Sequence, residues 1–323
     1  MSKPLFNIIQ DDLTELERTL VGALTSDEPL VHKIGAHLVN SGGKRLRPAL
    51  CILAARGGDN FTLAHILPLA AALEMIHTAS LVHDDVIDAA GTRRGKITAN
   101  AKWGNQAAIL SGDYIFARAF YLVANGNYDS YVAVRLAQLV ENLATGEIMQ
   151  DEHLYEPKVD WNGYYERIKK KTADFLEICC ELGAAVGGLP KETSDGLAAY
   201  GHAIGMAFQI TDDILDTWQD SSVLGKPAGN DIRQGIVTLP TLRALEVSPG
   251  RRELAKIISR RDMTEDMVET ALSIIRTTDA REFSVAKADE FLQKAKAALP
   301  KNLPSNIYTA FTEAADFIGK RQF

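Results

Sequence analysis

Apolar residues recur every three or four positions along most of this chain, which is the spacing of one face of an α-helix. The stretches 13–23 and 288–298 both follow this spacing, whereas alternating runs typical of strands are scarce. Polar loop clusters at 40–43, 57–60, 125–129, 156–161 and 219–231 separate the periodic stretches, and none resembles an interdomain linker. The pattern therefore predicts an all-α fold of about a dozen helices. The chain is expected to form a single-domain bundle over residues 1–323.

Two acidic clusters interrupt this pattern at the ends of apolar stretches. They read Asp84-Asp85-Val86-Ile87-Asp88 and Asp212-Asp213-Ile214-Leu215-Asp216. Like charges four residues apart on a helix repel each other, so such an end is costly unless a cation lies among the carboxylates. Magnesium prefers hard oxygen ligands and also binds phosphates. One cluster alone could be a solvated acidic helix end, but two copies with the same spacing favour a metal site.

Basic residues lie close to both clusters in the sequence. They are Lys44, Arg45 and Arg47 in a glycine-containing loop, Arg93 and Arg94 after the first cluster, the run 169–171, and Lys226 and Arg233 after the second cluster. Arginine donates two parallel hydrogen bonds to phosphate oxygens. Taken singly, each basic group could be a solvated surface charge. Their placement beside the carboxylates predicts a clamp for a diphosphate.

Two further side chains, both neutral, have the spacing that places them on the same helical face as an aspartate cluster. His77 precedes Asp84 by two turns, and Gln209 precedes Asp212 by three residues. A buried core histidine and a buried structural amide are the alternatives for these two positions.

Composition narrows the class of protein further. The net charge of −7 argues against a general nucleic-acid binder. Three cysteines, two of them adjacent, do not form a disulfide framework and fit a reducing compartment. The N-terminus lacks a signal peptide, and no uncharged apolar run approaches the length of a membrane span. We expect a cytoplasmic protein without a transmembrane segment, which touches a membrane only transiently when a greasy product leaves.

Several motifs in a fixed order resemble the trans-isoprenyl diphosphate synthases, also called polyprenyl synthetases, over essentially the whole chain. They lie at 43–48, 77–88, 93–95, 112–113, 146–147, 171–172, 208–216 and 224–227. The resemblance implies an isoprenoid synthase fold, a homodimer of antiparallel helical bundles, each around a central elongation cavity. It also implies about three magnesium ions, an allylic diphosphate such as farnesyl diphosphate, and isopentenyl diphosphate.

The resemblance assigns a role to individual residues of this sequence. The metal ligands are Asp84, Asp88 and Asp212, supported by Asp85, Asp213 and Asp216. The allylic diphosphate is held by Arg93, Lys171, Gln209 and Lys226, and isopentenyl diphosphate by Lys44, Arg47, His77 and Arg94. Thr172 lies near the reacting carbon, so that Lys171, Thr172, Gln209 and Arg93 form the catalytic set. One departure from the family pattern is Gly235-Ile236, where short-chain members often have Gly-Lys.

The expected chemistry is ionisation of the allylic diphosphate, condensation with isopentenyl diphosphate, and elimination of a proton. Ala79 and Ser80 lie roughly 6–8 Å down the helix from Asp84. Because an aromatic residue near there stops growth early in the family, these small side chains predict a long-chain product, hexaprenyl to decaprenyl, for quinone side chains. A deeper bulky residue could restore a shorter limit, so a short-chain farnesyl or geranylgeranyl diphosphate synthase is the alternative.

Three other classes of protein compete with this interpretation. A terpene cyclase usually carries a different second metal motif, whereas here the second motif is again Asp-Asp-x-x-Asp. A non-catalytic subunit should have eroded aspartates, and these are intact. The catalytic, partner-dependent half of a heteromeric synthase remains open.

Overall fold

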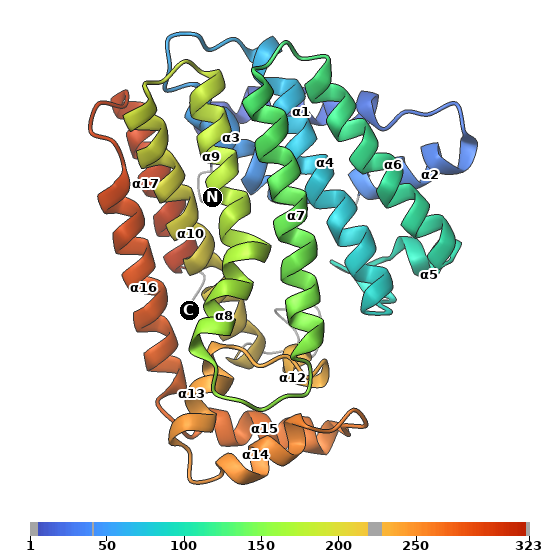
Figure 1. Cartoon of the computed structure of the whole chain (residues 1–323), viewed down its shortest axis with the longest axis vertical. Helices are drawn as coiled ribbons and strands as arrows, with labels where there is room; N and C mark the ends of the chain where they lie inside the picture. Colours follow the sequence, from blue (N-terminus) through green and yellow to red (C-terminus); the bar gives the residue numbers. More distant parts are fainter. Residues whose placement is uncertain (1–5, 41, 219–227, 321–323) are drawn as a thin grey trace. The chain divides into compact units, whose positions relative to one another are not determined.

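The computed structural model describes residues 6–40, 42–218 and 228–320, and most of these residues are helical (Figure 1). The all-α prediction is confirmed. The contacts between residues divide the chain into two compact units. The first comprises the described residues within Met1–Val140, Ile178–Ala198 and Pro300–Phe311, and the second those within Glu141–Glu177, Ala199–Leu299 and Thr312–Phe323. The single domain and its central cavity stay predictions.

The elements have the following bounds. The first part of the chain holds η1 (Asn7–Ile9), α1 (Gln10–Ala23), α2 (Pro29–Asn40), α3 (Leu46–Ala55), α4 (Leu63–Ile87), β1 (Thr92–Arg93), β2 (Lys96–Ile97), α5 (Ala99–Trp103) and α6 (Asn105–Ala124). Next come α7 (Ser130–Glu152), α8 (Trp161–Ile168), the π-helical turn η2 (Lys169–Ala173), α9 (Asp174–Val186) and α10 (Lys191–Trp218). The last are α12 (Asn230–Arg233), α13 (Leu239–Val247), α14 (Arg251–Ile258), α15 (Glu265–Arg276), α16 (Ala280–Ala298) and α17 (Ser305–Lys320).

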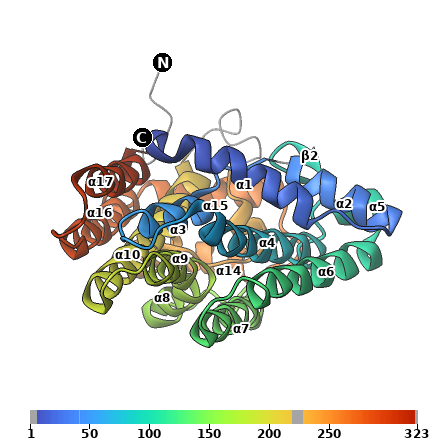
Figure 2. The same ribbon diagram turned by 90° about the horizontal axis from the view of Figure 1, so that it is seen from above.

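Helix α4 forms the core of the first unit. Its residues Leu69–Leu73 are completely buried, and the helix packs along α6 and against α3 and α1 (Figure 2). Pro68 lacks an N–H, and beside it the hydroxyl of Tyr128 enters the backbone ladder of α4. That hydroxyl accepts a hydrogen bond from Leu69 N at 3.2 Å and donates one to the carbonyl of His65. The long apolar helix thus runs without a break to the first aspartate cluster at its C-terminus.

A short hairpin follows α4 and carries the two arginines of the predicted clamp. β1 pairs antiparallel with β2, with Arg93 opposite Lys96. The two turn residues, Arg94 and Gly95, both have positive φ, at 52° and 74°. This is the backbone of a tight hairpin turn that normally favours Asn-Gly, and the unusual Arg-Gly pair explains why the sequence did not reveal it.

The second unit is built around a cluster of aliphatic side chains from α8, α10 and α12–α16. Ile210, Leu239, Leu254 and Ile275 are among its fully or almost fully buried members. Helix α8 begins where Asp160 accepts a hydrogen bond from the N–H of Gly163 at 2.9 Å, a capping contact that satisfies a free helix-end donor. Helices α13, α14 and α15 lie next to one another in sequence and in space (Figure 1).

The three cysteines and one of the two longest apolar helices are largely buried within the chain. Cys51, Cys179 and Cys180 are buried free thiols, as expected for inert core residues, and burial raises the pKa of Cys51. Helices α4 and α6 are each long and apolar enough to cross a membrane by length and composition. The apolar window of α4 is 67% buried within the chain, so α4 is a core helix, whereas that of α6 is 33% buried.

Candidate functional site

The first aspartate cluster lies at the C-terminal end of α4. Asp88 caps this helix and donates its backbone N–H to the carbonyl of Asp84, which places these two residues one turn apart. Between them Asp85 is buried and accepts a 2.6 Å hydrogen bond from Nε of Arg93. Burial raises the pKa of Asp85, and the guanidinium of Arg93 opposes that rise. The structure therefore pairs a predicted metal ligand with a predicted allylic-diphosphate contact.

Two of the predicted isopentenyl diphosphate contacts, His77 and Arg94, line a small cavity of about 50 Å³. The cavity is also lined by Arg93 and Asp85. Nη1 of Arg47 lies 3.2 Å from Nε2 of His77. Burial, together with the nearby arginines, holds the pKa of His77 well below its usual value. A guanidinium can only donate, so Nε2 of His77 accepts this hydrogen bond from Arg47 and carries no proton of its own, which leaves the imidazole neutral.

Loop residues before α3 complete this arginine-rich pocket. Arg45 binds Glu74 at 2.7 Å and Glu17 at 2.6 Å, so it anchors the loop to two helices. Arg94 donates from Nη1 to the carbonyl of Gly42. Lys44, which is predicted to bind isopentenyl diphosphate, is exposed on the same loop. A cavity with several guanidinium groups around a neutral histidine suits an anion.

Three of the predicted residues of the second unit, Thr172, Gln209 and Asp213, form one chain of hydrogen bonds. Thr172 donates to Oε1 of Gln209 at 2.9 Å, and Nε2 of Gln209 donates to Asp213 at 3.0 Å. The other oxygen of Asp213 accepts a 2.7 Å bond from the hydroxyl of Tyr164. Burial raises the pKa of Asp213 to about 6, although both of these donors favour its charged form.

Lys171 is held by two side chains of α7, one of which lies in the family motif at 146–147. Its ammonium pairs with Glu147 and donates to Oε1 of Gln150 at 3.1 Å. Neither partner was assigned a role from the sequence, although Glu147 belongs to one of the family motifs. Tyr164 was also missed, because its hydrogen-bond partner Asp213 lies 49 residues away and no local pattern links the two.

Asp216 ends the second cluster and ties the following segment to α10. Its side chain accepts from the N–H of Asp231 at 3.1 Å, and its carbonyl accepts from Gly229 at 2.8 Å. Lys226 lies outside the described residues. At the departure from the family pattern, Gly235 has a φ of 73°, and an added Cβ would lie 2.4 Å from the ring of Tyr155. Gly235 therefore has a structural role here.

The two predicted chain-length residues lie on α4. Ala79 is completely buried, and Ser80 donates its hydroxyl to the carbonyl of His77 at 2.9 Å. Their influence on product length stays a prediction.

The donor chemistry of both clusters suits magnesium. Each offers carboxylate oxygens alone, which are the hard ligands this ion prefers. Asp85, Asp213 and Asp216 are buried, whereas Asp84 and Asp212 are half-buried and Asp88 is exposed. The accessible carboxylates, together with waters and phosphates, are the natural metal contacts, and the buried ones orient the helix ends that present them.

A match to a family model decides what kind of protein carries these residues. The model for polyprenyl synthetase matches residues 28–275, more than half of the chain. The chain belongs to the polyprenyl synthetase family. It is accordingly a prenyltransferase with the all-α isoprenoid synthase fold.

Similar proteins come from several bacteria. The chain is 38% identical to component 2 of heptaprenyl diphosphate synthase from Bacillus subtilis, over 99% of this chain and 91% of the relative. It is 35% identical to octaprenyl diphosphate synthase from Escherichia coli, over 89% of each chain. A crystal structure of polyprenyl synthase from Caulobacter crescentus, complexed with calcium and isoprenyl diphosphate, matches with a TM-score of 0.93 and 36% identity. That match covers 99% of this chain and 98% of the other.

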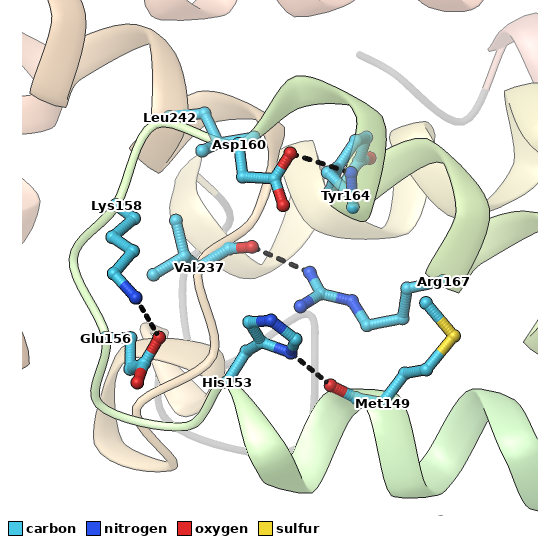
Figure 3. Close-up of a pocket in the computed structure, with 10 residues that line it drawn as sticks. Met149, His153, Glu156, Lys158, Asp160, Tyr164, Arg167, Val237 and Leu242 are labelled. Atoms are coloured by element: carbon cyan, nitrogen blue, oxygen red, sulfur yellow. Dashed lines mark hydrogen bonds and ion pairs between the residues drawn. The ribbon is translucent and has the colours of Figure 1, made fainter.

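A second cavity of about 200 Å³ in this polyprenyl synthetase is lined by Tyr164, Arg167 and Val237 (Figure 3). Arg167 reaches across it and donates from Nη2 to the carbonyl of Val237 at 2.7 Å. The guanidinium carbon also lies 5.7 Å from the centre of the Tyr164 ring. The positive charge of Arg167 lowers the pKa of Asp213 and so opposes the effect of burial on this carboxyl.

Proposed function

We propose that this chain condenses isopentenyl diphosphate with an allylic diphosphate, such as farnesyl diphosphate, in a magnesium-dependent reaction that gives a long-chain trans-polyprenyl diphosphate. Membership of the polyprenyl synthetase family, with both aspartate clusters intact, carries this proposal. The octaprenyl and heptaprenyl names of the relatives support a long product, as does the small buried side chain of Ala79.

Within the proposed reaction, the residues of this chain bind and orient the two diphosphates. The arginine pocket around His77 would hold isopentenyl diphosphate. Lys171 and Gln209 would hold the allylic diphosphate, with Arg93 and Lys226, and Thr172 would lie beside the reacting carbon. Bound magnesium would neutralise the charge that builds up on the departing diphosphate. The ligands Asp84, Asp88 and Asp212 would then be supported by the buried carboxyls.

A partner-dependent enzyme is the second candidate function. Two of the relatives, from Bacillus subtilis and Geobacillus stearothermophilus, are named as component 2 of heptaprenyl diphosphate synthase. The names imply that those proteins act with another component. The same arrangement in this protein would require a second chain for full activity.

We infer a homodimer that forms through the outer face of α6. Ile109, Leu110 and Tyr121 are exposed on this helix, and Leu110 is 60% exposed. Apolar side chains that project from one exposed helix are typical of a protein–protein interface. We also place the protein in the cytoplasm, with transient membrane contact for product release.

One assay tests the reaction and the need for a partner together. The purified chain is incubated with farnesyl diphosphate, labelled isopentenyl diphosphate and magnesium, and product length is read by chromatography. Condensation by the chain alone, abolished by a chelator, supports the proposal. No product from the chain alone would favour the two-component alternative, and a product of farnesyl or geranylgeranyl length would overturn the long-chain assignment.

Sedimentation tests the dimer separately. Leu110→Glu should convert a dimer into a monomer, because it places a charge in the apolar interface. Val21→Glu, at an exposed apolar residue of α1, is the matched control and should leave the dimer intact. A wild-type monomer, or equal effects of both substitutions, would refute the α6 interface.

A further inference from the structure

The two predicted contacts Lys171 and Thr172 lie within a π-helical turn. In η2 the N–H of Asp174 donates to the carbonyl of Lys169, five residues earlier, instead of four. Such turns are rare, and within α-helices they often occur at functional sites. A π turn places its side chains at different angles from an α-helix. The groups that hold this turn therefore set the directions of Lys171 and Thr172.

Two glycines on neighbouring helices let the turn pack tightly. A Cβ added to Gly146 on α7 would lie 2.9 Å from Cγ of Lys171. One added to Gly205 on α10 would lie 2.5 Å from Cα of Ala173. Both distances are shorter than Cβ atoms show in real structures. Only a residue without a Cβ fits at either position, so the backbones of α7 and α10 pack directly against the π turn. Small movements of this turn would thus be transmitted directly to its side chains.

Asp174 lies where these elements meet, and its carboxylate binds groups from two of them. One oxygen accepts from Nζ of Lys169 at 3.1 Å and from Nδ2 of Asn142, on α7, at 2.8 Å. The other oxygen lies 4.0 Å from Nδ1 of His202 on α10. Asp174 is 5% exposed, so its carboxylate is shielded from water. Burial raises the pKa of Asp174, and the ammonium of Lys169 opposes that rise.

His202 and Glu177 extend this cluster along α9 and α10. Nδ1 of His202 lies 3.0 Å from Oε2 of Glu177. The ligand atoms of Asp174, Glu177 and His202 lie within 4.8 Å of one another, a grouping that could hold a metal ion. However, the ammonium of Lys169 already neutralises Asp174 and would repel a divalent cation. The cluster is better explained as a charged brace.

We propose that Asp174 is a positioning residue, which clamps Lys169 at the start of the π turn to α7 and thereby orients Lys171 and Thr172 toward the allylic diphosphate. This inference rests on the roles proposed above for Lys171 and Thr172. Without the clamp, Lys169 loses its buried partner and the turn loses its tie to Asn142. Lys171 and Thr172 would then sample more directions, whereas the arginine pocket around His77 does not depend on this clamp.

Steady-state kinetics of Asp174→Asn provide the test, with Lys169→Met as the second variant in case the first folds poorly. Lys169 is 40% exposed and its replacement keeps an apolar stem of similar length. Glu181→Gln is the matched control because Glu181 lies on the same helix and forms a salt bridge with Arg135. The wild type, these variants, the double variant of Asp174→Asn with Lys169→Met, and Asp174→Glu are all assayed with both diphosphates, and thermal unfolding measures the stability of each.

We expect both brace variants to raise KM for the allylic diphosphate and lower kcat, each by roughly 10-fold, because a displacement of about 1 Å can cost far more than that. KM for isopentenyl diphosphate should change by less than about 2-fold, since its proposed contacts lie elsewhere. The double variant should be no worse than either single one, because both remove the same ion pair. Glu181→Gln should change the thermal stability, but it should not raise KM for the allylic diphosphate more than KM for isopentenyl diphosphate.

Other results would overturn the positioning role. Unchanged kinetics in Asp174→Asn and Lys169→Met would remove it, as would equal shifts in both KM values or a loss of stability without a kinetic change. Failure of the proposed function itself is distinguishable, because the wild-type protein would then give no condensation at all. Restored kinetics in Asp174→Glu would add support, since that variant keeps the charge.

Discussion

Replacing Asp213 with asparagine should stabilise the magnesium-free protein at neutral pH while it impairs the enzyme. Asp213 is 4% exposed, and burial raises the pKa of its carboxyl from 3.8 to about 6. A shift of this size corresponds to ~3 kcal/mol, at 1.36 kcal/mol per pKa unit. Because the folded pKa lies above the unfolded one, this contribution favours folding fully below pH 3.8 and is lost as the pH rises through about 6.

Asparagine can take the place of the carboxylate without leaving a neighbour unsatisfied. Its carbonyl can accept from Gln209, and its amide can donate to the hydroxyl of Tyr164, which can act as donor or acceptor. The pKa of about 6 already includes the hydrogen bonds from Gln209 and Tyr164, so the loss of these charged bonds is not subtracted again. We therefore expect Asp213→Asn to be more stable than wild type by about 3 kcal/mol near pH 8. Near pH 4, where the folded carboxyl is protonated and neutral, the two proteins should be about equally stable.

Urea unfolding in the presence of a chelator measures this difference. Both proteins are unfolded at several pH values between about 4 and 8, where the expected change lies. Asp195→Asn is the control, because Asp195 lies on the same helix but is exposed and paired with Lys191. It should show no pH-dependent gain relative to wild type. A stability difference between Asp213→Asn and wild type that does not vary with pH would refute the buried-charge argument.

The remaining predictions concern the reaction and the product. Asp84→Ala and Asp212→Ala should each lower magnesium-dependent condensation by about 100-fold or more, and near-normal turnover would remove that residue from the ligand set. Ala79→Tyr should shorten the product to about farnesyl or geranylgeranyl length by filling the space below the first cluster, and an unchanged chromatogram would contradict this. Gly146→Ala should lower stability by about 1–3 kcal/mol and raise KM for the allylic diphosphate by displacing Lys171, and unfolding and kinetics check both effects.

Helical periodicity was enough to predict the fold class, because buried helices leave a strong repeat in the sequence. The β-hairpin was missed since it depends on two positive φ angles, one of them at Arg94, rather than on a run of strand-forming residues. The π turn was also missed, because nothing in the run of lysines signals one extra residue per turn. Both features are set by tertiary contacts, which a local pattern does not contain.

The charged residues of the site could be predicted because they form repeated or clustered motifs in the sequence. The aspartate clusters and the arginines carry charge that the sequence shows directly. Tyr164, Glu147 and Asp174 were missed because their roles come from their partners across the fold, which are far away in the chain. Residues that position a site, rather than contact a ligand, are thus the part that requires coordinates.

Both aspartate clusters combine accessible and buried carboxylates, and this difference gives the members of each cluster different tasks. Asp85 is fixed by Arg93, and Asp213 by Tyr164 and Gln209, and burial raises the pKa of both. A buried carboxyl with a raised pKa is costly to keep charged, so its retention points to a function beyond stability. We infer that the second aspartate of each cluster orients the helix end, while the half-buried Asp84 and Asp212 face the ion. Substituting Asp84 or Asp212 should therefore weaken magnesium-dependent activity with little change in the free energy of unfolding. Substituting the buried Asp213 should instead change the free energy of unfolding, which the urea experiment measures.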